Sequence, residues 1–261
     1  MNNLLAQICE KKKIELEFSK KRCSFSSLEK LIQEKKNRSF KQLLINSQNK
    51  KNNNLIAEIK KASPSAGIII QDYVPENIAM NYEKCGVGAI SILTETSFFK
   101  GQLEHLSVIN KKTNLPIIRK DFIIDPYQIL ESKVYQADAI LLIVSILSDN
   151  QIKDFINLAK QYRLDCLIET HTEEDLNRAI NIGYPIIGIN NRNLKNLSVN
   201  INNTLNLIKK IPKEFIVVAE SGIKSKTDID KYNDVDVFNF LIGESILKSS
   251  NINDKIREFL N

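Results

Sequence analysis

Short apolar runs rich in Ile, Leu and Val recur from residue 55 onward, and each is followed by a segment of helical length. Runs with so few polar interruptions are typical of strands buried on both faces of a parallel sheet. The predicted strands cover residues 55–60, 87–93, 115–122, 138–144, 164–169, 184–190, 214–221 and 235–243.

The segments between these runs begin with the chemistry of helix starts. Thr172 precedes three acidic residues, which combines a side-chain cap with favourable charge at a helix amino terminus. Pro126 follows Asp125 and fits the first turn of a helix. Predicted helices start near Pro75, Gln102, Asp125, Asp149, Thr172, Asn202 and Ser225, and a last helix covers residues 244–260.

Eight strand–helix units predict an α/β fold of the (β/α)8 TIM barrel type, for which 261 residues is an ordinary length. A doubly wound open sheet is the alternative, and it predicts a glycine-rich turn after the first strand. No GxGxxG follows residues 55–60, so the pattern favours the barrel. We expect one domain overall, with a catalytic barrel over residues 55–261 and an N-terminal helical extension and linker over residues 1–54.

The extension has the spacing of amphipathic helices. The sequence SSLE starting at Ser26 is a capping-box pattern. Leu28, Leu31 and Ile32 share a helical face, which favours docking onto the barrel over a disordered basic arm. We expect helices over residues 4–18 and 26–36, followed by a polar linker over residues 47–54.

The net charge of +6 is unevenly distributed. Residues 1–54 carry 13 Lys and Arg against 5 Asp and Glu, a net charge of +8, whereas residues 55–261 carry −2. A non-catalytic protein that binds nucleic acid through its arm is therefore an alternative, but the Lys-rich arm has no interleaved aromatic residues. We expect no nucleic-acid partner, and we expect the extension to cap the active-site rim and attract an anionic substrate.

Other classes are disfavoured by what the composition lacks. No run approaches the ~20 apolar residues of a membrane span, and the amino terminus does not resemble a signal peptide. The four cysteines form no CxxC, which fits reduced thiols in the cytoplasm. The only histidines are His105, expected on a surface or in packing, and His171, expected to be structural. Two histidines make a zinc site or a histidine triad improbable, so we expect no metal.

Polar residues gather where the predicted strands end. In a barrel these ends surround the active site, and charges buried there must be paired or used. Cations mixed with carboxylates suit an anionic substrate and acid–base chemistry. The strand ends carry Glu58 and Lys60, Arg119 to Phe122, Glu169, Asn190 to Arg192, Glu220 to Gly222, and Gly243 to Ser245.

Glycine turns follow the seventh and eighth strands, at Ser221-Gly222 and Gly243-Glu244. Barrels bind phosphate at this place through backbone N–H groups, although such glycines also occur in ordinary turns with positive φ. The first loop, KKASPSAG, contains Ser63 and is either a mobile loop that closes over substrate or a plain surface turn.

Taken together, these motifs resemble the indole-3-glycerol phosphate synthase family. KDF, NxRxL and ESGI lie on three separate strands in family order, and the basic extension is also a family feature. The related phosphoribosylanthranilate isomerase would require a Cys near the end of the first strand, where this chain has Glu58-Ile59-Lys60. The matching segments are IAEIKKASPSAG, ISILTETSFFKGQLEHL, PIIRKDFIIDPYQI, ADAILLI, IETHTEEDL, IIGINNRNL, VVAESGI and FLIGESIL.

The resemblance implies conversion of 1-(2-carboxyphenylamino)-1-deoxyribulose 5-phosphate to indole-3-glycerol phosphate, with loss of carbon dioxide and water. It implies no cofactor or metal, and no obligate protein partner is inferred. By motif match, Lys120 would be the general acid at the substrate ketone and Glu169 the general base. Lys60, beside Glu58, would contact substrate and protonate the leaving hydroxyl. A lysine among other cations would also have a lowered pKa.

We expect Asn190 and Glu58 to belong to the catalytic set with the two lysines and Glu169, and the resemblance assigns the remaining residues to substrate binding. Asn190, Arg192 and Ser63 would orient the anthranilate carboxylate, and Phe122 would pack on the aromatic ring. Glu244 stands where some relatives carry Ser, so only its backbone N–H is expected to bind phosphate. The other phosphate-binding residues would be Ser221, Gly222 and Gly243, and Glu220 would complete the polar network.

Overall fold

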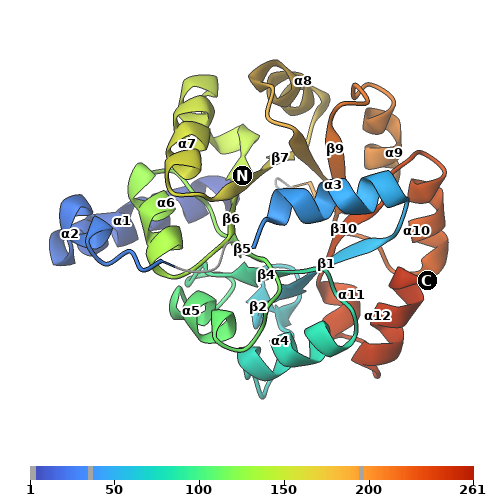
Figure 1. Ribbon diagram of the computed structural model, residues 1–261, viewed down its shortest axis with the longest axis horizontal. Coiled ribbons are helices and arrows are strands. Elements are labelled where there is room, and N and C mark those ends of the chain that lie inside the picture. The colour runs from blue at the N-terminus through green and yellow to red at the C-terminus, as the bar shows by residue number, and fades with distance from the viewer. Residues whose placement is uncertain (1–3, 35–37, 194–196) are drawn as a thin grey trace.

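The computed structural model describes residues 4–34, 38–193 and 197–261. Within this part of the chain, eight parallel strands close into a barrel in the order β1-β10-β9-β8-β7-β6-β5-β4 (Figure 1). The closed barrel confirms the predicted fold class. Its strands are β1 (Asn54–Ile59), β4 (Ala89–Leu93), β5 (Ile117–Lys120), β6 (Ala139–Ile143), β7 (Asp165–Thr170), β8 (Ile186–Asn190), β9 (Ile216–Glu220) and β10 (Asn239–Ile242).

Helices follow the strands and surround the barrel, and several begin at the residues that the sequence indicates. Thr172 and Ser225 both form capping boxes, and Asp125 caps a helix whose first residue is Pro126. The helices are α4 (Pro75–Lys84), α5 (Glu104–Asn110), α6 (Pro126–Val134), α7 (Asp149–Gln161), α8 (Glu173–Ile182), α9 (Asn202–Ile208), α10 (Lys226–Asn233), α11 (Glu244–Leu247) and α12 (Ile252–Leu260), with a 3-10 turn η1 (Val144–Ile146).

The last predicted helix, residues 244–260, is divided in two. Residues between α11 and α12 leave the helix, and the Asn251 side chain caps α12 by accepting hydrogen bonds from two of its first N–H groups. The side-chain amide thereby provides a new helix start inside the predicted span. Among the described residues, no helix is both long and apolar enough to cross a membrane.

Strand alternation separates two layers of core. On β1, Leu55, Ala57 and Ile59 pack outward against the helices, whereas Ile56 packs inside the barrel. Glu58 has the same parity as Ile56, so its side chain follows the barrel interior to the carboxyl end of the strand. The same alternation governs every strand that contributes a side chain to the barrel mouth.

Within residues 4–34 and 38–53, three helices precede the barrel: α1 (Leu4–Arg22), α2 (Phe25–Glu29) and α3 (Phe40–Lys50). The expectation of a polar linker over residues 47–54 was wrong, because α3 continues to Lys50 and β1 begins at Asn54. The apolar face of α3 is narrow. Its buried residues are Phe40 and Leu44, and neither has any exposed surface. Two apolar positions among Asn, Gln and Lys give only a weak helical pattern, so the sequence did not predict α3.

The second predicted helix is also shorter than expected. It ends at Glu29 rather than residue 36, and its cap is Ser24, whose hydroxyl accepts from the Ser27 N–H, rather than Ser26. Residues 35 and 36 lie outside the described residues. Leu28 is buried beside Leu16 of α1 and Leu130 of α6, and Ile32 packs against the same cluster, so this part of the extension docks on the barrel as predicted. The inclusion of Leu31 in the docking face was wrong, because the helix ends at Glu29 and Leu31 is 55% exposed.

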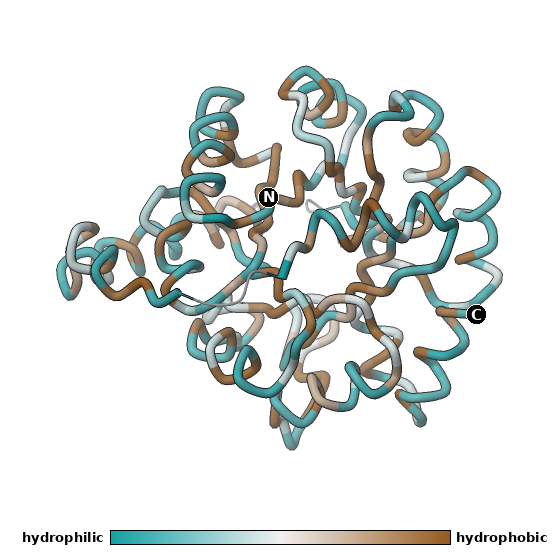
Figure 2. The backbone as a smooth tube through the Cα atoms, viewed as in Figure 1, coloured by the Kyte–Doolittle hydropathy of each residue, from teal (hydrophilic) through white to brown (hydrophobic). Residues whose placement is uncertain are grey.

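The helices of the extension lie at opposite ends of the barrel. In Figure 1 α3 crosses in front of the strands, and its Leu44 carbonyl accepts from Asn239 at the start of β10. By contrast, Lys12 of α1 reaches Asp121, directly after β5, at the carboxyl ends of the strands. Figure 2 shows the strands mainly as hydrophobic segments, with hydrophilic segments on the outer helices.

Candidate active site

The carboxyl ends of the strands surround a cavity of about 480 Å³. A smaller cavity of about 70 Å³ adjoins it, and Ser63 lines this smaller cavity. The structure therefore gathers all but Ser63 of the predicted site residues around one space. Those lining the main cavity are Glu58, Lys60, Lys120, Phe122, Glu169, Asn190, Arg192, Glu220, Ser221, Gly222, Gly243 and Glu244.

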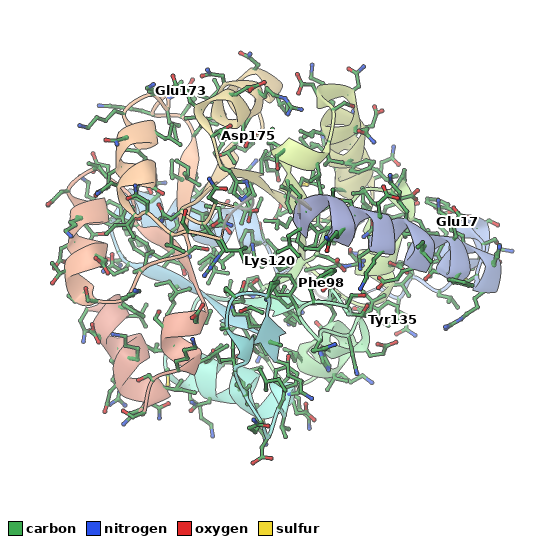
Figure 3. All side chains as sticks on the ribbon, turned by 180° about the vertical axis from the view of Figure 1, so that it is seen from behind. Glu17, Phe98, Lys120, Tyr135, Glu173 and Asp175 are labelled. Atoms are coloured by element: carbon green, nitrogen blue, oxygen red, sulfur yellow. The ribbon has the colours of Figure 1, made fainter. Side chains whose placement is uncertain are left out.

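Lys120 lies at the centre of this site, between the carboxyl groups of Glu169 on β7 and Glu220 on β9. Its Nζ is 2.8 Å from Glu169 Oε2 and 3.2 Å from Glu220 Oε2. Figure 3 shows Lys120 near the middle of the molecule, on the face where α1 lies. All three side chains have the parity of the barrel interior, which explains why residues from β5, β7 and β9 meet.

The environments of these groups separate their pKa values. Burial alone would lower the pKa of Lys120, but Glu169 and Glu220 outweigh it and raise that pKa. The expectation of a lowered lysine pKa was therefore wrong, because carboxylates rather than cations surround this ammonium. Burial also favours the neutral form of Glu169, yet the adjacent Lys120 keeps the Glu169 pKa well below its usual range.

Glu220 has the opposite behaviour. Burial raises the pKa of Glu220, and its proximity to the Glu169 charge adds to the increase, so that the Lys120 ammonium does not restore it. The same cluster therefore moves the pKa values of Glu169 and Glu220 in opposite directions. Two carboxyl groups with separated pKa values are a common arrangement for acid–base chemistry.

Two glycines provide space for the carboxylates. A Cβ at Gly188 on β8 would lie 2.2 Å from Glu220 Oε1, and one at Gly243 would lie 2.6 Å from Glu58 Oε1. Gly243 has a φ of −130°, so its role is close approach rather than the positive-φ turn considered from the sequence. Gly188 is a site feature that the sequence motifs did not reveal.

Lys60 and Glu58 form a second charged pair on β1 and the residue after it. Lys60 Nζ is 2.5 Å from Glu58 Oε1, and both side chains are largely buried. The separation of two residues places them on one face, as the sequence predicts. A second ammonium thus lines the same cavity as Lys120.

Asn190 and Arg192 extend the site from the end of β8. Asn190 Oδ1 accepts from the Arg192 N–H at 3.0 Å, which ties the loop to the strand. The guanidinium donates to Ser65 Oγ at 3.3 Å and pairs with Glu244 at 3.4 Å. Arg192 therefore connects the first loop with the start of α11.

The glycine turns after β9 and β10 lie at one end of the cavity. Ser221 and Gly222 have φ values of 65° and 79°, so the backbone turns sharply there. Lys224 and Lys248 also line the cavity at this end. Sequence motifs did not identify these two lysines, because each lies on a loop or helix beyond the strand-end residues.

Apolar residues line the other end. Phe122 is 7% exposed and its ring centroid is 6.3 Å from that of Phe99, which the sequence did not single out. The adjoining small cavity is lined by both phenylalanines and by residues of α1, namely Leu4, Leu5 and Ile8. The first loop folds as a hairpin of β2 (Ala62–Ser63) and β3 (Gly67–Ile68), in which Ser63 Oγ accepts from the Ala66 N–H.

A buried ionic network lies behind the site. Arg119, which has the outward parity of β5, donates to Asp121, and Lys12 of α1 reaches the other oxygen of Asp121 at 3.1 Å. These two cations keep the pKa of Asp121 well below its usual range despite burial. The network thus joins α1 to the segment that carries Lys120 and Phe122.

Comparison with known structures supports the fold. KGPDC from Streptococcus mutans has a TM-score of 0.62 at 16% identity, covering 80% of this chain and 95% of that one. An N-acetylmannosamine-6-phosphate 2-epimerase from Clostridium perfringens has a TM-score of 0.57 at 16% identity, covering 76% and 89%. At such identities the likeness concerns the fold alone.

Sequence comparison is more specific. Residues 5–259 match the family model described as indole-3-glycerol phosphate synthase. Proteins of that name are 44% identical in Endomicrobium trichonymphae, over 98% of both chains, and 47% identical in Thermoanaerobacter pseudethanolicus, over 98% of this chain and 97% of the relative. With the barrel and its charged mouth, these matches show that the chain belongs to the indole-3-glycerol phosphate synthase family.

Proposed function

We propose that this chain converts 1-(2-carboxyphenylamino)-1-deoxyribulose 5-phosphate to indole-3-glycerol phosphate in tryptophan biosynthesis, and that the reaction takes place in the charged cavity. The observation that carries the assignment of roles is the position of Lys120 between Glu169 and Glu220, at 2.8 and 3.2 Å. One ammonium and two carboxyl groups, one with a lowered and one with a raised pKa, then face the same space.

The first step forms a bond between the ring carbon that carries the carboxylate and the ketone carbon. Negative charge develops on the ketone oxygen, and Lys120 donates a proton to it. Loss of carbon dioxide returns the electron pair to the ring and restores its aromaticity. A positioned acid of this kind contributes about 10²–10⁴-fold to rate.

The second step removes water. The hydroxyl formed from the ketone leaves with a proton from Lys60, and Glu169 accepts a proton from the substrate as the indole double bond forms. Glu58 lies 2.5 Å from Lys60 and holds its ammonium at the cavity wall. Both steps balance without a redox partner, so neither a metal nor a cofactor is required by this scheme.

The two ends of the cavity suit the two ends of the substrate. Backbone N–H groups of Ser221, Gly222, Gly243 and Glu244 would bind the phosphate, with Lys224 and Lys248 adding positive charge. Asn190 and Arg192 would orient the carboxylate of the ring. Phe122 would pack on the ring itself, and Ser63 would act from the adjoining cavity through the first loop.

An assay of product fluorescence tests the proposal. The purified chain, incubated with the substrate and EDTA, is expected to produce indole fluorescence at a rate proportional to enzyme concentration. Absence of product at high enzyme concentration would contradict the proposed function.

A further inference from the structure

His171 lies beside Glu169 in the barrel mouth, although the sequence suggested only a structural role. The two residues are separated by one position at the end of β7, so they share the inward face. His171 Nε2 is 3.2 Å from Glu169 Oε1, and the side chains are 7% and 2% exposed. Because a carboxylate only accepts hydrogen bonds, a hydrogen bond at this contact requires a proton on Nε2 of the imidazole.

The backbone of His171 is fixed by the start of α8. Its N–H donates to Asp175 Oδ2 at 3.1 Å, and the same carboxylate accepts from the N–H of Thr172. Thr172 in turn accepts from the Asp175 N–H, which completes the capping box. The imidazole therefore projects toward Glu169 from a rigid turn, and Figure 3 shows Asp175 on the same face of the molecule as Lys120.

The two oxygens of Glu169 are held by different partners. Oε2 is bound by Lys120 and Oε1 by His171. If Lys120 donates its proton to the substrate, as in the proposed function, its hold on Oε2 weakens during the reaction. Because His171 comes from the same strand end as Glu169, its contact does not depend on Lys120.

We propose that His171 is a positioning residue that holds the Glu169 carboxylate through Oε1, so that the base keeps its orientation while Lys120 is engaged by substrate. This inference rests on the proposed function. The other charged groups that face Glu169 are Lys120 from β5 and Glu220 from β9. Donation from His171 favours the ionised form of Glu169, so removal of the donor raises the pKa of that base.

A pair of substitutions separates donation from packing. His171→Gln keeps an N–H donor near the position of Nε2, whereas His171→Met keeps similar length without a donor. We expect His171→Met to lower kcat about tenfold with KM within about twofold, and to shift the acidic limb of the kcat profile to higher pH. His171→Gln is expected to recover kcat to within about threefold of the wild type. Equal loss in both variants, or wild-type kcat and pH profile in His171→Met, would overturn the inference.

Two further measurements keep this test decisive. His105→Met, at the other histidine of the chain, is the matched control and is expected to keep the wild-type pH profile. Nitrogen NMR of the wild-type histidines is expected to show a proton on Nε2 of His171 at neutral pH, and an unprotonated Nε2 would contradict the inference even if a variant failed to fold. Wild-type protein that forms no product would instead refute the proposed function, while the NMR result would still report on the His171 contact.

Discussion

At the scale of single residues, the chemistry depends on the different pKa values of two carboxyl groups that contact the same ammonium. Glu169 and Glu220 both contact Lys120, yet the pKa of Glu169 is lowered and that of Glu220 is raised. Of the two carboxyl groups, Glu220 therefore takes up a proton more readily. We expect its role to differ from the basic role proposed for Glu169.

This difference predicts unequal effects of the same substitution. Glu220→Gln replaces the carboxyl group whose pKa is raised and is expected to lower kcat at pH 7 by less than about tenfold. Glu169→Gln removes a base and is expected to lower kcat by about 10²–10⁴-fold, with a smaller effect on KM. Steady-state kinetics of the two variants at pH 7 checks this, and equal losses would contradict the unequal roles of the two groups.

Residue identities at the strand ends could be predicted from the sequence, whereas their environments could not. Successive side chains of a strand point to opposite faces, so the positions of Glu58, Lys120 and Glu169 in their strands predict that they face the barrel interior. The raised pKa of Lys120 depends on Glu169 and Glu220, which are 49 and 100 positions away in sequence. Only barrel closure brings them within 2.8 and 3.2 Å. The contact between His171 and Glu169 could not be predicted for the same reason, because it depends on side-chain direction.

At the scale of elements, α1 is anchored by an ion pair inside the protein. Lys12 is 5% exposed and bridges Glu15 at 2.9 Å and Asp121 at 3.1 Å. The helix thereby contacts the segment after β5 and brings Leu4 and Ile8 to the small cavity beside Phe122. Ordinary amphipathic spacing predicts a docked helix, but a buried lysine within a run of three lysines is visible only in the structure.

Removal of this anchor is expected to destabilise the fold. Lys12→Met leaves the buried Asp121 without one of its two cations and should reduce the free energy of unfolding by about 3 kcal/mol at neutral pH. The low pKa of Asp121 in the folded state stabilises the protein above the ordinary Asp pKa, and this stabilisation is lost as pH falls. The difference between variant and wild type should therefore shrink below about pH 4.

The neighbouring lysine offers a matched control for this experiment. Lys13 is exposed and forms an ion pair with the equally exposed Glu10 of its own helix, so Lys13→Met is expected to leave the denaturation midpoint unchanged. Urea denaturation of both variants at pH 7 and at about pH 3 makes the comparison. A similar midpoint for Lys12→Met and the wild type at pH 7 would show that the buried pair does not anchor α1.

At the scale of the whole molecule, helices of the basic extension pack against both ends of the barrel. α3 closes the amino end with Phe40 and Leu44, whereas α1 lies beside the active-site mouth. Deletion of residues 1–45 would therefore expose the core as well as remove charge. The division into an extension over residues 1–54 and a barrel over residues 55–261 stays a prediction, as does the absence of a nucleic-acid partner.

Charge neutralisation tests attraction of substrate without disturbing the core. Lys11, Lys13 and Lys21 are exposed on α1, and their joint replacement by Gln is expected to lower kcat/KM severalfold at low salt. The difference should vanish at high salt, because salt screens exposed charges. A kcat/KM equal to that of the wild type at both salt concentrations would contradict electrostatic attraction by the extension.

The most direct test of the whole account is a single-turnover reaction with substrate labelled in its carboxyl group. The wild type is expected to release one labelled carbon dioxide for each indole product formed. Lys120→Ala should form both products at least about 10²-fold more slowly, because bond formation to the ketone needs the acid. Release of both products by Lys120→Ala at the wild-type rate would remove Lys120 from the chemistry and contradict the account.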